Sequence, residues 1–134
     1  MSSIYMLEAR PEDIAREYHH RKAEYVERIK NLVDHVEIDY PDGGSYVGQI
    51  QNNMKDGQGI FCYPSEDVYF GGWKNNKFHG QGVYIFKSGE IYDGLLNQNC
   101  KEGIGTYYFD DGTAYYSGNW HNDVKHGTGV YNSP

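Results

Sequence analysis

The sequence lacks an excess of basic residues: it has 12 lysines and arginines against 19 aspartates and glutamates, a net charge of -7. The basic surface typical of nucleic-acid-binding domains is therefore absent, and general attraction to anionic membranes is disfavoured. No apolar run approaches the roughly 18 residues that a membrane helix needs, and the first residues carry no secretory signal. The two cysteines, Cys62 and Cys100, lack C-x-x-C spacing, which is typical of reduced thiols in an intracellular protein.

Glycine is missing from the first 42 residues, although the chain contains 17 glycines from Gly43 onward. This shift predicts two parts, a helical segment over residues 1–36 and a glycine-rich region over residues 37–134. Pro11 suits a first helical turn, and apolar residues then recur in steps of mostly three, four or seven, which predicts one amphipathic helix ending near residue 36. Its apolar face either packs on the rest of the chain or docks on a partner. That contact face comprises Ile14, Tyr18, Tyr25, Ile29, Leu32 and Val36.

The glycine-rich region repeats itself. G-x-G pairs begin at residues 57, 80, 103 and 127, in steps of 23, 23 and 24. The repeats span residues 46–68, 69–91, 92–115 and 116–134, and a half-repeat precedes them at 37–45. The additional residue falls between Gly112 and Gly118, where we expect a bulge or a longer turn.

Each repeat consists of two alternating runs with turn residues such as Asn75-Asn76-Lys77 between them. Two or more glycines per run argue against a helix. We therefore predict a mostly β fold, a single-layer antiparallel meander with one hairpin per repeat, preceded by the amphipathic helix.

Alternation places the aromatic residues and the glycines on the same face of this sheet. A strand glycine leaves a vacant site over which a neighbouring ring can lie flat. Because such a face offers large, rigid contact area, we expect it to bind a partner protein. The predicted contact residues are Tyr46, Tyr69, Trp73, Tyr84, Phe86, Tyr92, Tyr107, Phe109, Tyr116 and Trp120.

The G-x-G pairs and the nearby histidines do not indicate an enzyme. A phosphate-binding G-x-G needs a following helix, whereas here each pair precedes a β-rich run. His79 and His126 recur with the repeat, which favours a structural role in the hairpin. We predict no catalytic residue, no metal site and no cofactor.

The pattern Y-x-G-x-W followed by K-x-H-G-x-G, at a period of 23 residues, resembles the MORN repeat (membrane occupation and recognition nexus). The second repeat, YFGGWKNNKFHGQG, is closest to that pattern. The first repeat has Ile50 and Asp56, and the third has Leu96 and Glu102, in place of Trp and His. The resemblance implies a curved, groove-like β-meander and roles in scaffolds and protein–protein interaction, as in ciliary and cytoskeletal complexes.

The resulting hypothesis is a non-enzymatic scaffold or adaptor subunit in the cytoplasm, within a ciliary or cytoskeletal assembly of other proteins. One alternative is a peripheral lipid-binding module, with Lys74, Lys77, Lys101 and Lys125 along one edge of the sheet. A net charge of -3 over residues 43–134 disfavours it, because six basic residues face nine acidic ones. Another alternative is an accessory subunit of an enzyme complex.

Overall fold

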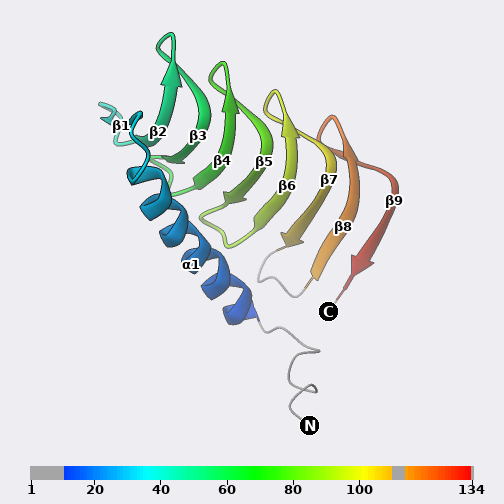
Figure 1. Ribbon diagram of the computed structural model, residues 1–134. Coiled ribbons are helices and arrows are strands. Elements are labelled where there is room, and N and C mark those ends of the chain that lie inside the picture. Colours follow the sequence, from blue (N-terminus) through cyan, green and yellow to red (C-terminus); the bar gives the residue numbers. More distant parts are fainter. Residues whose placement is uncertain (1–10, 110–113, 134) are drawn as a thin grey trace.

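The computed structural model describes residues 11–109 and 114–133, which form one helix and a nine-stranded antiparallel sheet (Figure 1). The strands follow one another across the sheet in chain order, so the predicted meander preceded by a helix is confirmed. The elements are α1 Pro11–Lys30, β1 His35–Asp39, β2 Ser45–Gln51, β3 Met54–Cys62, β4 Val68–Lys74, β5 Lys77–Ile85, β6 Ile91–Asn97, β7 Cys100–Phe109, β8 Ala114–His121 and β9 Val124–Asn132.

The helix ends at Lys30, six residues earlier than the sequence predicted. The backbone N–H groups of Asn31 and Leu32 bond to carbonyls three residues back, which tightens the last turn. Val36 then lies in β1, where it pairs with Gly48 and packs against the aromatic side of the sheet. Its assignment to the helix contact face was therefore wrong, because the alternation from Val36 to Asp39 belongs to a strand.

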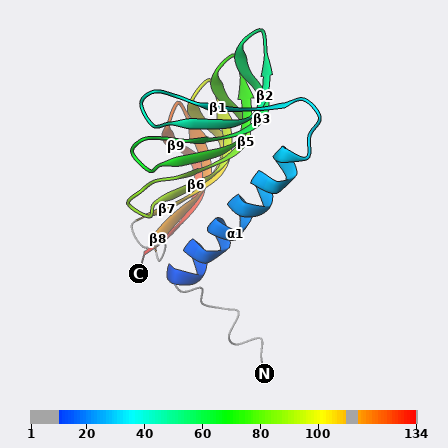
Figure 2. The same ribbon diagram turned by 90° about the vertical axis from the view of Figure 1, so that its left-hand side faces the viewer.

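The remaining apolar face of α1 packs on the protein's own sheet (Figure 2). Tyr18, Tyr25 and Ile29 are 5%, 5% and 1% exposed, and Ile14 and Leu32 pack partly buried beside them. Of the two alternatives, the intramolecular one is the one observed. On the sheet, this core contains Ile60, Phe70, Val83 and Ile91.

Polar contacts at Asp93 fix the N-terminal half of α1 on the sheet. The Tyr18 hydroxyl and the Arg21 guanidinium both donate to Oδ2 of Asp93, at 2.6 and 2.9 Å, and Gln81 donates to its other oxygen. At Asp93, the row of cross-strand neighbours beneath the helix also changes from apolar to polar residues. That row runs through Val47, Ile60, Phe70 and Val83, and continues as Asp93, Thr106 and Ser117.

Four hairpins, β2–β3, β4–β5, β6–β7 and β8–β9, each close with a two-residue turn whose two residues both have positive φ. This backbone matches the type I′ turn, which suits the twist of paired strands and favours asparagine or glycine. The sequence meets the requirement with Asn52-Asn53, Asn75-Asn76, Gln98-Asn99 and Asn122-Asp123.

Each of these four hairpins also contains a register shift at the same place in the repeat, the first between Gly48 and Ile50. Bulges bend strands, and the aligned shifts accompany a bend of the whole sheet, with α1 on its outer side (Figure 2). The bulge expected near residues 112–118 is not found in its described part, since β7 and β8 pair without a shift up to Phe109 and Ala114. Residues 112–113 lie outside the described residues.

Packing of α1 predicts the effect of Ile29→Ala. Because Ile29 is 1% exposed, truncation leaves a cavity, and we expect the free energy of unfolding to fall by about 2–5 kcal/mol. Urea unfolding followed by circular dichroism measures this loss. Val33→Ala is the matched control, since Val33 is fully exposed and its truncation should change stability by less than about 0.5 kcal/mol. Equal effects of the two variants would contradict the packing described for α1.

Candidate functional site

A row of paired glycines crosses the sheet from β2 to β9. Each member faces the next across the strands, and the row carries no side chains. A Cβ atom at Gly82 would lie 2.2 Å from the hydroxyl oxygen of Tyr69, so the ring fills the space that the glycine leaves. The predicted covering of glycines by rings is thus confirmed. The row comprises Gly48, Gly59, Gly71, Gly82, Gly94, Gly105, Gly118 and Gly129.

One tyrosine of each repeat lies over this glycine floor and bonds to the strand irregularity. Tyr69 donates its hydroxyl proton to the carbonyl of Gly72 at 2.8 Å, within the segment where the register shifts. Tyr46, Tyr92 and Tyr116 make the same bond to the carbonyl three residues ahead, at 2.7, 2.7 and 3.1 Å. Each ring therefore supplies a hydrogen-bond donor to a carbonyl in the irregular segment.

The two tryptophans complete the floor. The indole N–H of Trp73 donates to the Gly59 carbonyl at 3.0 Å, and its ring stands edge-on to Tyr69 with the ring centroids 5.1 Å apart. Trp120 bonds to the Gly105 carbonyl in the same way. Leu96 replaces tryptophan in the repeat between them.

Six of the ten predicted contact residues are buried in this floor, none more than 7% exposed: Tyr46, Tyr69, Trp73, Tyr92, Tyr116 and Trp120. They shape the surface and offer a partner little area. The other four, Tyr84, Phe86, Tyr107 and Phe109, are half-buried and form a wall beside the floor. We call the surface made by these ten residues, together with Phe61, Tyr63, Phe78 and Leu96, the aromatic groove.

Phe78 was not among the predicted contacts, although its ring stacks on Tyr69 at 4.0 Å. Its alternation with Gly80 and Gly82 along the same run was the available signal. Tyr40 was also missed, although its ring stacks on Phe61 at 5.6 Å. The parallel between the half-repeat and the first repeat could have indicated its position.

Two adjoining hollows open in the aromatic groove. One, of about 230 Å³, is lined by Tyr69, Phe78, Tyr84, Phe86, Tyr92 and Leu96, among others. The next, of about 340 Å³, lies beside Tyr107, Phe109 and Trp120. These hollows are adjacent to the half-exposed rings of the wall and give the surface relief that can accept protruding side chains.

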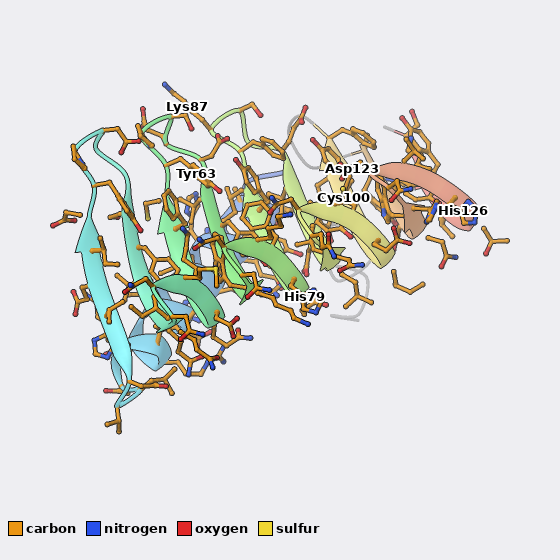
Figure 3. The ribbon with its side chains drawn as sticks, turned by 90° about the horizontal axis from the view of Figure 1, so that it is seen from above. Tyr63, His79, Lys87, Cys100, Asp123 and His126 are labelled. Atoms are coloured by element: carbon orange, nitrogen blue, oxygen red, sulfur yellow. The ribbon has the colours of Figure 1, made fainter. Side chains whose placement is uncertain are left out.

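The histidines singled out in the sequence do not converge. His79 lies in β5 and His126 in β9, and Figure 3 shows them well apart along one side of the sheet. Within residues 11–109 and 114–133, no three His, Cys, Asp or Glu side chains come together in a cluster that could hold a metal ion. His126 instead lies beside His121, with 5.4 Å between the ring centroids, and His121 pairs with Glu102 at 2.8 Å.

Burial raises the pKa of five groove tyrosines above the ordinary value: Tyr46, Tyr69, Tyr84, Tyr92 and Tyr107. It raises the pKa of Tyr63 to about 12, and the Asp67 charge adds to the effect of burial. Beneath α1, burial likewise raises the pKa of Tyr25 to about 12. In both cases the folded state favours the neutral phenol.

These shifts predict alkaline unfolding. The stabilisation from keeping the tyrosines neutral is complete below pH 10, and it is lost as the pH rises from 10 through about 12. Tyrosinate absorbance and circular dichroism measured along one pH titration should therefore change together in that range. Gradual ionisation of most tyrosines near pH 10 in an intact fold would contradict the burial described.

Comparison with protein families gives a match to the MORN repeat over residues 46–68, 69–91, 92–114 and 116–134. These four segments agree with the repeats derived from the spacing, apart from residue 115, which the match omits. No curated protein matched the chain in the corresponding comparison. The four matches cover more than half of the sequence, and the chain belongs to the MORN repeat family.

Proposed function

We propose that the protein is a non-enzymatic adaptor that binds partner proteins through the aromatic groove. The observation that supports this proposal is that only one face of the sheet is covered by another element. The outer face is covered over part of its length by α1, whereas no element of the described chain packs over the groove. Half-exposed tyrosine and phenylalanine rings beside open hollows are typical of surfaces that bind protein segments. A MORN repeat array is a non-enzymatic repeat type, which agrees with this proposal.

The lysine positions give less support to lipid binding. Lys74 and Lys77 face each other at the end of the β4–β5 hairpin. Lys101 and Lys125 instead lie over rings in the aromatic groove, so the four lysines do not line one edge. The helix in the described chain is not apolar enough to cross a bilayer. An accessory subunit of an enzyme complex would use the same groove.

The proposed setting is a ciliary or cytoskeletal complex in the cytoplasm, and it rests on the family resemblance alone. A fluorescently tagged full chain should co-localise with axonemal or cytoskeletal markers and remain with the detergent-insoluble cytoskeleton. Diffuse staining and complete detergent extraction would contradict this setting, but not binding through the groove.

Groove binding predicts that Phe86→Ala combined with Phe109→Ala removes partners from affinity purifications. Both rings are half-buried, and losing two aromatic contacts should weaken binding at least about tenfold. Quantitative mass spectrometry of purifications from native cells measures this loss. Leu95→Ala combined with Ile104→Ala is the control, because both side chains are exposed, at 40% and 59%, and neither packs in the groove. Retention of every partner by the groove variant would overturn the proposal.

A further inference from the structure

Three lysine ammonium groups lie over the rings of the aromatic groove. Lys55 lies 5.3–5.7 Å from the centroids of Tyr46, Phe61 and Trp73. Lys101 has the same arrangement over Tyr92, Tyr107 and Trp120. Lys125 lies 5.1–5.3 Å from three rings, those of Phe109, Tyr116 and Tyr131. The ring faces attract the cations and hold positive charge along the groove.

The position between Lys55 and Lys101 departs from this pattern at two residues, Phe78 of the second repeat and Leu96 of the third. Phe78 stands where Lys55 and Lys101 stand in the neighbouring repeats, 23 residues away on either side. Leu96 stands where the flanking cages, the sets of three rings around Lys55 and Lys101, have Trp73 and Trp120. No lysine therefore replaces Phe78 here, and the hollow of about 230 Å³ opens beside Phe78 and Leu96, with the neighbouring Lys101 and Asp123 also in its lining.

The cations differ in how they are neutralised. Lys101 pairs with Asp123 at 3.4 Å. Among the described residues, Lys55 and Lys125 form no ion pair, and the nearest polar partner of the Lys55 ammonium is the Asn76 side-chain oxygen at 3.5 Å. Desolvation also lowers the pKa of Lys55, which reflects its partial burial. A partly desolvated ammonium without a counter-charge gains most from an incoming anion.

Along the groove the order is Lys55, then the hollow beside Phe78 and Leu96 with Lys101 in its lining, and then Lys125. Neighbouring positions are two strands apart, roughly 9.6 Å for strands spaced about 4.8 Å. Carboxylates also face the groove: Asp67 and Glu90 accept hydrogen bonds from Tyr84 and Tyr107, and Asp123 pairs with Lys101. Lys55 and Lys125 are therefore the groove lysines without an ion pair among the described residues.

We propose that the aromatic groove selects an acidic segment of a partner protein, with one bulky apolar side chain in the hollow between Phe78 and Leu96. Carboxylates on either side of that side chain meet Lys55 in one direction and Lys101 and Lys125 in the other. This inference rests on the proposed function and specifies the chemistry of the partner. A peptide fits better than a bilayer, because Lys55 and Lys101 are half-buried among the groove rings.

The test uses two synthetic peptides and amide NMR spectra of the full chain. One peptide carries a single leucine flanked on both sides by glutamates, and the other has lysines in place of the glutamates. The acidic peptide should shift amide signals of groove residues, with an affinity that falls as salt rises. Equal binding of the lysine peptide, or no groove shifts at millimolar acidic peptide, would overturn the inference.

Neutralising one cation tests the charges. Lys55→Met keeps an apolar stem over the rings, and we expect it to weaken the acidic peptide about fivefold. Lys74→Met is the matched control, since Lys74 is exposed at the far end of its hairpin and should bind as the wild type does. Unchanged binding by Lys55→Met would contradict the role of this lysine.

The hollow is tested by Phe78→Lys combined with Leu96→Trp, which reproduces the cage of the neighbouring repeats. This variant should bind the leucine peptide about tenfold more weakly and prefer a peptide with glutamate at the central position. Leu96→Trp alone provides a second variant should the pair fold poorly. Unchanged affinity for the leucine peptide in both variants would show that the hollow is not the anchor site.

Two outcomes separate this inference from its alternatives. Phosphatidylserine vesicles that bind in a Lys55-dependent manner and displace the acidic peptide would reassign the groove to a membrane surface. A cellular partner that is lost with Phe86→Ala and Phe109→Ala, but kept by Lys55→Met and by the cage variant, would overturn the acidic-segment inference and leave the proposed adaptor function standing.

Discussion

The contact between a tyrosine ring and the glycine floor is the constraint on which the rest of this structure depends. Tyr69 lies over Gly82 with no room for a Cβ, and its hydroxyl reaches the carbonyl of Gly72, where the strand pairing shifts. One side chain thus covers bare backbone and satisfies an irregular segment of the same strand. Repeated in four hairpins, the contact accompanies aligned register shifts and a sheet bent in one direction.

The two faces of the bent sheet are packed in different ways. The outer face packs smaller apolar side chains against α1, and its cover is delimited by Asp93, which accepts hydrogen bonds from Tyr18 and Arg21. The inner face is stabilised within the sheet by its own rings. A single-layer sheet can thereby bury apolar side chains on both faces, although nothing in the described chain covers its inner face.

Period and alternation were sufficient to predict the meander and the shared face of glycines and rings. The end of α1 was missed, because Leu32 and Val36 continue the helical spacing while cross-strand pairing decides the conformation of Val36. Burial of Tyr46 and Trp73 was also missed, since alternation assigns a face but not the depth created by a bend. The register shifts depend on hydrogen bonds across strands, which one sequence does not display.

The repeat spacing also relates helices to this sheet. Seven residues of an α-helix rise about 10.5 Å, close to the roughly 9.6 Å of two strand spacings. Tyr18 and Tyr25, seven residues apart on α1, accordingly reach Asp93 in β6 and the Gly71 carbonyl in β4. For a helix that crosses the strands, one heptad therefore corresponds to one repeat of the sheet. The number of repeats then determines how many successive heptads can make equivalent contacts.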